Sequence, residues 1–181
     1  RLLPLAAIAE RVSHILDLPP APAVDLPARH RSIADVFAYS WGMLPVTIAD
    51  QLRRLSVFRG GFSLEAAESV ADAGLADLAE LVDRSWARVD ERGRYDLHEL
   101  VRQYCAEQLE SQGAEVTALA HQRHAAYFAA LLGPKEDRYN RESSALAEAT
   151  VEIGNIEVAW DWATRQGAPA IAYPLYMSLY F

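Results

Sequence analysis

The stretch YDLHELVRQYCAE, residues 95–107, decides how the chain folds. Its first three residues alternate in hydropathy as a strand does, and the apolar residues that follow recur at helical spacing. Asp96 and Glu99 stand three residues apart, which predicts a capping box that opens a helix. His98 then lies in the first turn, beside free backbone N–H groups and the positive end of the helix dipole. Such a position suits an anion, for example a phosphate group.

Outward from this stretch, the sequence predicts a β-hairpin between helices. Residues 86–90 and 94–97 alternate in hydropathy, and Glu91-Arg92-Gly93 supplies the turn between them. A helix over residues 99–111 follows. Apolar residues also recur at helical spacing in four segments before the hairpin, which are residues 32–44, 48–58, 63–71 and 75–82. Helices followed by a two-stranded hairpin and a further helix predict a winged helix-turn-helix over residues 31–113.

Both flanks of this unit are predicted to be helical. Residues 1–18 form a short amphipathic helix, and the four prolines of residues 19–28 predict an extended connector before a helix capped by Ser32. Residues 114–181 carry only helical patterns separated by short breaks, which favours stacked helical hairpins of a solenoid. The predicted fold class is therefore mainly α, with domains at residues 1–30, 31–113 and 114–181. Both ends are apolar, and we expect the chain to be an excerpt of a larger protein.

The charge of the chain argues against a DNA-binding surface. The composition is that of a globular protein, with 51% apolar and 23% charged residues, but the formal net charge is −8. The predicted recognition helix, residues 75–86, carries three acidic residues and one arginine, and the wing carries as many acidic residues as arginines. A helix that enters the major groove needs cations, because like charge repels the phosphates.

The single cysteine, Cys105, excludes internal disulfides and fits a reducing compartment. Its helical spacing with Val101 and Leu109 favours a packing role over a nucleophilic one. The apolar opening of the chain is too short for a membrane span, and no cleavage pattern follows it. We therefore expect a cytoplasmic protein.

The chain resembles one bacterial family, the winged-helix region of large STAND-class NTPases, which include LuxR- and AfsR-type regulators. The resemblance is carried by the runs RHRSIADVFAYSWGML (29–44), LRRLSVFRGGFSLEAAESVA (52–71), LVDRSWARVDERGRYDLHELVRQYCAEQL (81–109) and RHAAYFAAL (123–131). NIEVAWDWA (155–163) is similar to the first helices of the tetratricopeptide-like array in such proteins. The match covers nearly the whole chain in continuous order.

This resemblance implies a context for the chain. An upstream nucleotide-binding domain would carry the phosphate loop, and residues 1–30 would be the end of a helical subdomain, residues 1–18, with its proline-rich linker. The downstream repeats would sense a protein or small-molecule signal. No G-x-x-x-x-G-K-[ST] occurs in the chain, so we expect a non-catalytic fragment, with ATP or ADP a cofactor of the full-length protein only. In NB-ARC relatives a Met-His-Asp motif contacts ADP, and Leu97-His98-Glu99 stands in its place. The resemblance thus implies that His98 senses the ADP phosphates. It also implies that the winged helix is a nucleotide-dependent intramolecular clamp. On activation the clamp would be released for assembly, which includes homo-oligomerisation.

Other candidate sites are weaker. His121 and His124 stand three apart on a predicted helix, but two ligands are too few for structural zinc, so no metal site is expected. No Ser-His-Asp or Cys-His spacing indicates catalysis. The alternative function is a DNA-binding winged-helix transcription factor domain. A continuous basic face over residues 75–86 and the wing would favour that alternative, and an acidic or apolar face would favour docking to another domain.

Overall fold

The computed structural model describes residues 28–132 and 150–180 of the chain. The predicted helix of residues 1–18 and nearly all of its proline-rich connector lie outside the described residues. The chain divides into two compact units, residues 1–43 and 44–181. Helix α2 (Ala28–Gly42) is the described element of the first unit. The predicted N-cap at Ser32 is wrong, because the helix already begins at Ala28, directly after a proline, a residue that favours helix starts.

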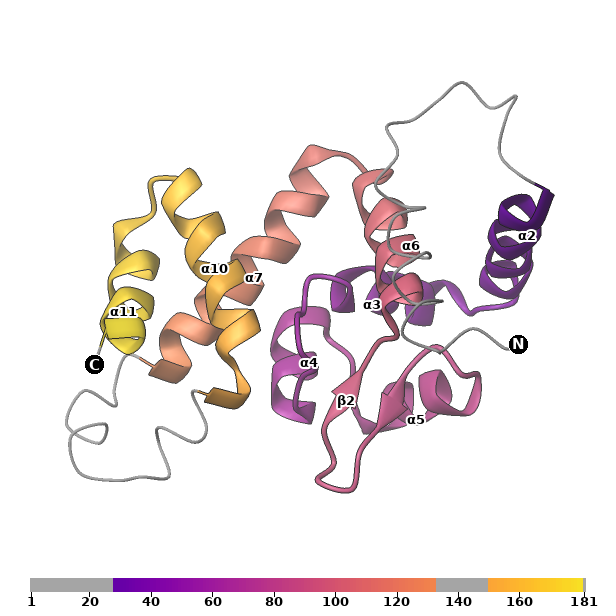
Figure 1. Ribbon diagram of the computed structural model, residues 1–181, viewed down its shortest axis with the longest axis horizontal. Helices are drawn as coiled ribbons and strands as arrows, with labels where there is room; N and C mark the ends of the chain where they lie inside the picture. Colours follow the sequence, from indigo (N-terminus) through magenta and orange to yellow (C-terminus); the bar gives the residue numbers. More distant parts are fainter. Residues whose placement is uncertain (1–27, 133–149, 181) are drawn as a thin grey trace, which may run out of the picture. The chain divides into compact units, whose positions relative to one another are not determined.

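The second unit begins with a winged helix-turn-helix (Figure 1). Its elements, in chain order, are α3 (Val46–Leu55), α4 (Leu64–Ala71), α5 (Leu75–Asp83), β1 (Arg88–Val89), β2 (Tyr95–Asp96) and α6 (Glu99–Glu110). The two strands are antiparallel, with Arg88 opposite Asp96 and Val89 opposite Tyr95. Phe62, between α3 and α4, forms an antiparallel bridge with Tyr95. The predicted fold class, mainly α with a winged helix followed by further helices, is confirmed.

Side chains from every helix of the domain meet in its core. Those at most 1% exposed include Leu52, Leu55, Phe62, Val70, Leu78, Leu81 and, from α6, Cys105. Ser63, the first residue of the predicted segment 63–71, caps α4, and its hydroxyl accepts the N–H of Ala66 at 3.2 Å. Gly61 has φ +84, and a Cβ there would lie 2.7 Å from the carbonyl oxygen of Tyr95. Glycine is therefore required where the Phe62 segment meets β2.

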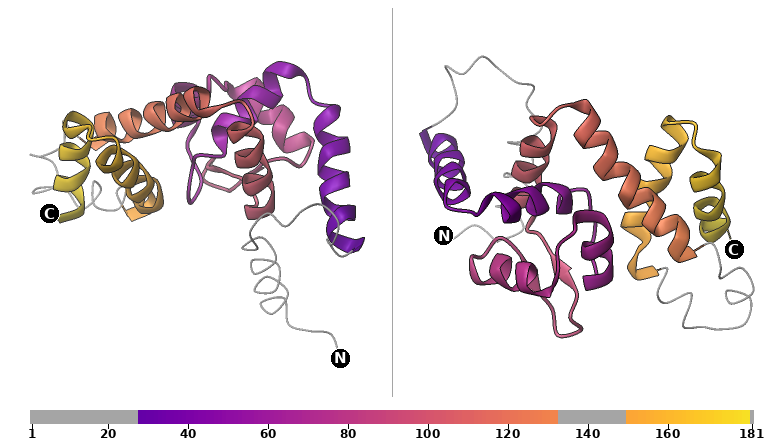
Figure 2. Two further views of the ribbon diagram at one scale, coloured as in Figure 1. Left: turned by 90° about the horizontal axis from the view of Figure 1, so that it is seen from above. Right: turned by 180° about the vertical axis from the view of Figure 1, so that it is seen from behind.

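Among the described residues, three further helices follow the winged helix: α7 (Ala114–Leu132), α10 (Ile153–Arg165) and α11 (Pro169–Tyr180). We call them the helical region. Both α10 and α11 pack against α7, as the two views of Figure 2 also indicate. Their shared core consists of Phe128, Ile156, Ala159, Ala163 and Leu175, all fully buried or nearly so. None of the described helices combines the length and apolar character needed to cross a membrane.

A buried amide joins the helical region to the winged helix. Asn155 of α10 is fully buried, and its Oδ1 accepts the backbone N–H of Arg59 at 2.7 Å. Its Nδ2 donates to the carbonyl of Gly61 at 2.9 Å and to Glu152 at 2.7 Å. One side chain thus satisfies both a donor and an acceptor of the loop after α3, across more than ninety positions of sequence. Gly154 lets this loop approach, since a Cβ there would lie 3.1 Å from the carbonyl oxygen of Arg59.

Two further side chains complete this contact. Arg94 of the wing binds Glu152 through both terminal nitrogens, and it also donates to the carbonyl of Gly61 at 2.9 Å. The ion pair is largely shielded, with 18% of the Arg94 side chain and 14% of the Glu152 side chain exposed. His124 of α7 is buried against Phe58 and Phe128, and its Nε2 lies 3.4 Å from Oδ1 of Asn155. We call this set the polar junction; its side chains are Arg94, His124, Glu152 and Asn155.

The first prediction concerns the amide. Asn155→Ala removes the acceptor of the backbone N–H of Arg59 and one of the two side chains that donate to the carbonyl of Gly61, so we expect the free energy of unfolding to fall by roughly 2–3 kcal/mol. Glu157→Ala, an exposed change on the same helix, should shift it by less than about 0.5 kcal/mol. Urea denaturation followed by circular dichroism measures both. Equal stabilities of the two variants would contradict the role of Asn155.

The second prediction concerns pH. Burial lowers the pKa of His124 from its usual 6.5 to about 4. Between these values the unfolded chain binds one more proton than the folded chain, so the stability present above pH 6.5 is lost as pH falls toward 4. His124→Gln removes this titration, and we expect its stability to depend less steeply on pH in that window. Urea denaturation across the window measures the two slopes, and identical slopes would exclude His124 as their source.

Candidate functional site

The helix-turn-helix consists of α4, a turn at residues 72–74, and α5. Asp72 ends α4 in the left-handed conformation, at φ 56. Gln51 of α3 holds the turn, donating to the carbonyl of Asp72 at 2.8 Å and to Asp77 at 2.9 Å. Arg123 of α7 binds the carboxylate of Asp72 and the carbonyl of Ser69, and it thereby places a cation at the C-terminal end of α4. The turn is thus held in place by side chains of α3 and α7.

The exposed face of α5 is acidic and apolar. Leu75 is 61% exposed, and Asp83 is exposed as well. The single cation of the segment, Arg84, binds Glu80 one turn earlier at 2.9 Å. Residues 75–86 therefore present three carboxylates and one guanidinium that is already paired. A duplex would meet net negative charge on this helix.

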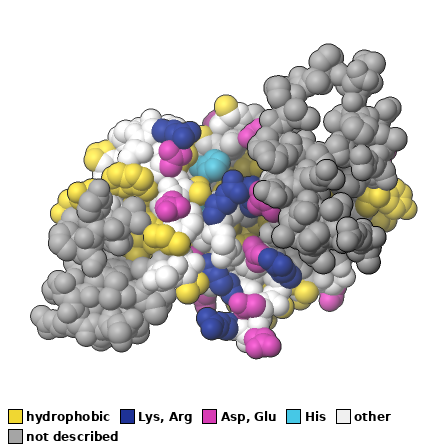
Figure 3. Space-filling model, viewed as in Figure 1, with side chains coloured by type: hydrophobic (Ala, Val, Ile, Leu, Met, Phe, Trp, Pro, Cys, Tyr) yellow, Lys and Arg dark blue, Asp and Glu magenta, His cyan; other side chains and the backbone are white. Residues whose placement is uncertain are grey.

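Most of the wing arginines are also engaged by carboxylates. Arg88 pairs with Asp96 across the hairpin, and Arg94 pairs with Glu152. Asp90 accepts the backbone N–H groups of Arg92 and Arg94 at 2.9 Å each, and these bonds lower the pKa of its carboxyl group. Figure 3 shows basic and acidic side chains interspersed on one face, without a continuous basic area in the visible, described part of that face. We call α5 and the hairpin together the α5–wing surface.

His98 lies where the sequence placed it, at the start of α6, but the cap differs from the prediction. His98 itself is the N-cap, and its Nδ1 accepts the N–H of Leu100 at 3.3 Å. The predicted capping box of Asp96 and Glu99 is wrong. Asp96 belongs to β2 and binds Arg88, because strand pairing directs its side chain across the hairpin.

The surroundings of His98 are mixed in charge. Glu99 binds Arg102 and Gln103, and these partners lower the pKa of its carboxyl group to about 2. Arg59 approaches the same carboxylate at 3.6 Å. His98 is exposed, so its ring is accessible from outside the domain. Whether it contacts a nucleotide stays a prediction.

The remaining sequence candidates lie apart from this site. Cys105 is fully buried in α6, and burial raises the pKa of its thiol, as a packing role requires. His124 belongs to the polar junction, whereas His121 lines a cavity. Within the described residues, no three His, Cys, Asp or Glu side chains gather as metal ligands would.

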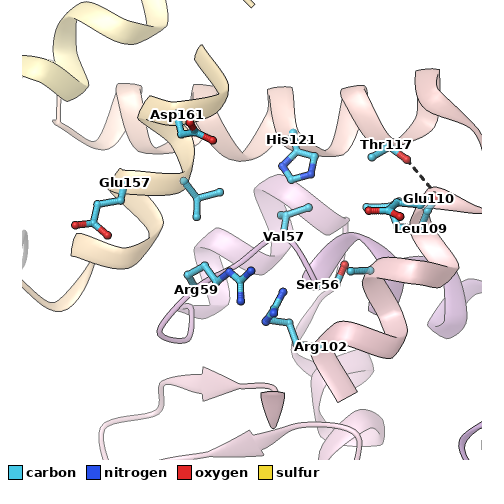
Figure 4. Close-up of a pocket in the computed structure, with 12 residues that line it drawn as sticks. Ser56, Val57, Arg59, Arg102, Leu109, Glu110, Thr117, His121, Glu157 and Asp161 are labelled. Atoms are coloured by element: carbon cyan, nitrogen blue, oxygen red, sulfur yellow. Dashed lines mark hydrogen bonds between the residues drawn. The ribbon is translucent and has the colours of Figure 1, made fainter. Parts of the chain in front are cut away.

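The cavity lies between the loop after α3 and helices α6, α7 and α10, and it has a volume of about 420 Å³. Figure 4 shows the guanidinium groups of Arg59 and Arg102 facing each other on one side, with His121 opposite them. The carboxylates of Glu110 and Asp161 point toward the same space from the flanks. We call this space the junction cavity, since the winged helix and the helical region both line it.

The polar junction was not predicted from the sequence, although polar residues on apolar helix faces indicated buried hydrogen bonds there. Positions 152, 155, 159 and 163 lie on one face of a helix, and two of them are polar. His124 likewise interrupts the apolar line between Ala120 and Phe128. A polar residue on an apolar helix face indicates a buried hydrogen-bond partner. The partner of each such residue, however, can be identified only in the structure.

Comparison with known proteins supports the fold. Residues 45–110 match the winged helix-turn-helix domain family. Two mycobacterial relatives are "Putative HTH-type transcriptional regulator Rv0890c" of Mycobacterium tuberculosis and "Putative HTH-type transcriptional regulator Mb0914c" of Mycobacterium bovis. Each is 33% identical over 162 residues, which cover 83% of this chain and 18% of the relative. No solved structure is significantly similar to the chain.

The chain thus spans about a fifth of the length of the curated relatives it matches. Neither the family match nor these relatives point to a STAND ATPase or to tetratricopeptide repeats, and they favour the DNA-binding alternative over the nucleotide-dependent clamp. Residues 45–110 form a winged helix-turn-helix domain, and the chain that carries it is similar to mycobacterial proteins named as HTH-type transcriptional regulators.

Proposed function

We propose that this chain is an internal regulatory part of a transcription regulator, in which the winged helix docks on protein rather than reading base pairs. The proposal rests on the charge of the α5–wing surface, because residues 75–97 contain six acidic side chains and four arginines. Three of these arginines are held by carboxylates. Phosphate neutralisation needs cations that are free to exchange counterions for phosphates, and this surface offers few.

The winged helix is also bound to the helical region. The polar junction holds the loop after α3 and Arg94 of the wing against α10. Arg94, a wing cation that would otherwise be available to a duplex, is drawn into this contact, and binding to Glu152 raises its pKa. A winged helix that moves together with a following helical region suits a part that transmits a signal within a larger protein.

DNA binding by the same domain is the second candidate function, and the comparisons favour it. The matched family is of the helix-turn-helix type, and the relatives carry the names of HTH-type transcriptional regulators. However, a DNA-binding element in the other four fifths of such a relative would account for the name equally well. The charge of the α5–wing surface is therefore the deciding observation, and a direct binding measurement is the test.

The nucleotide-dependent form of the docking proposal rests on the family resemblance and on His98. In that form, an upstream domain binds ATP or ADP, and this chain, without a phosphate loop, is non-catalytic. His98 stands exposed at the N-terminus of α6, where an upstream domain can present a phosphate to it. The partners would be that domain, within the same protein, and a protein or small-molecule signal at the helical region.

The third prediction concerns DNA. We expect a random-sequence duplex to bind the chain more weakly than about 10⁻⁴ M at physiological salt, the weak limit of ordinary non-specific binding. Fluorescence anisotropy of a labelled duplex measures the affinity. Arg92→Ala should have no effect beyond that of Arg165→Ala, an exposed arginine on α10 that serves as the control. Micromolar binding that falls with salt and with Arg92→Ala would establish DNA binding instead.

The fourth prediction concerns His98 in the full-length protein. His98→Asn keeps an oxygen that can cap α6, so the fold should be as stable as the wild type, but it removes the imidazole. We expect faster release of bound ADP and a higher basal activity, because the inactive state loses a contact. Exposed Gln112→Ala is the control. Wild-type ADP release together with wild-type activity would remove His98 from the mechanism.

A further inference from the structure

The junction cavity contains charges of both signs in separate places. On its floor, Arg102 and Arg59 share one carboxylate, that of Glu99, which Arg102 holds bidentately and Arg59 approaches at 3.6 Å. Among the described residues, Glu99 supplies the one carboxylate paired with these two guanidinium groups, so the three side chains together carry one net positive charge. Burial and the neighbouring Arg102 both lower the pKa of Arg59, which indicates that the two cations repel each other.

The flanks of the cavity carry the opposite charge. Glu110, at the end of α6, makes no ion pair with any described residue. Asp161 of α10 binds only Arg165, and both side chains of that pair are more than half exposed, so this ion pair is weak. Glu110 is therefore the flank carboxylate that a cationic group can approach without displacing an ion pair of the described residues.

We propose that the junction cavity binds a small zwitterion of the amino-acid or short-peptide class, with its carboxylate on Arg59 and Arg102 and its ammonium group on Glu110. Guanidinium groups bind carboxylates with planar, charge-assisted hydrogen bonds. A purely anionic ligand such as phosphate would meet the carboxylates of the flanks, and a purely cationic ligand would meet the guanidinium floor. Only a ligand with both charges satisfies the whole lining.

Size and position support this assignment. A volume of about 420 Å³ lies in the lower part of the range of known ligand cavities, which suits a small molecule. The cavity is lined from both sides, by Arg59 and Arg102 of the winged helix and by His121 and Asp161 of the helical region. Arg59 also gives its backbone N–H to Asn155, so a ligand on its side chain acts directly on the polar junction. The inference rests on the proposed signal-transmitting role, but not on whether the winged helix avoids DNA.

The fifth prediction tests this site with triglycine and the standard amino acids as probes, using the whole chain. We expect at least one probe to raise the unfolding temperature and to bind in isothermal titration calorimetry. N-acetylation or C-terminal amidation of that probe should weaken binding at least about tenfold, because each removes one charge. Inorganic phosphate should not bind. Failure of every probe, equal binding of a blocked form, or equal binding of phosphate would each overturn the proposal.

Variants locate the ligand. Arg59→Met removes a half-exposed side chain but leaves the backbone N–H that Asn155 accepts, so the fold should persist. It should weaken probe binding at least about tenfold, and Glu110→Gln should do the same by removing the charge that holds the ammonium group. Arg84→Met, an exposed arginine of α5, is the matched control and should bind as the wild type does. Wild-type binding by Arg59→Met would overturn the assignment whatever the outcome of the DNA and His98 measurements.

Discussion

The buried amide of Asn155 is the interaction on which the arrangement of the second unit depends. A loop that follows a helix carries backbone groups that must find partners, and here a side chain more than ninety residues away supplies them. Because an amide has both a donor and an acceptor, it recognises the N–H of Arg59 and the carbonyl of Gly61 in one orientation only. An apolar side chain would fill the same space without fixing that orientation. The ion pair between Arg94 and Glu152 then ties the wing to the same point.

This contact has an electrostatic consequence for the other side of the domain. An arginine that completes a buried junction is unavailable to a phosphate backbone, and the neighbouring wing arginines are balanced by carboxylates of the hairpin itself. The helix-turn-helix geometry is thus present without the excess positive charge that DNA binding ordinarily requires. The fold by itself therefore does not indicate DNA binding, since the fold arises from apolar packing and the function from the charges on its surface.

Much of the architecture was predictable from local patterns. The hairpin, the helix-turn-helix and the start of α6 at Glu99 follow from hydropathy periods, and the Ser63 cap follows from a short-range preference. Local reasoning failed where two local preferences compete. Asp96 had a favourable spacing for a capping box, but strand pairing placed it opposite Arg88, and His98 took the cap instead. The start of α2 was misplaced because Ser32 prefers an N-cap, but this preference is small and the helix begins one turn earlier, at Ala28.

The sequence by itself determined which segments form helices and strands, that they assemble as a winged helix-turn-helix followed by helices, and that residues 75–97 carry net negative charge. These properties depend on neighbours a few positions apart, so periodicity and composition reveal them. Only the tertiary structure decided which partners the buried polar residues have. The meeting of Asn155 with the loop after α3, the burial of His124 and the charged lining of the junction cavity all join residues distant in sequence. A polar residue on an apolar helix face indicates a buried hydrogen bond, but the identity of its partner depends on how the helices and strands pack together.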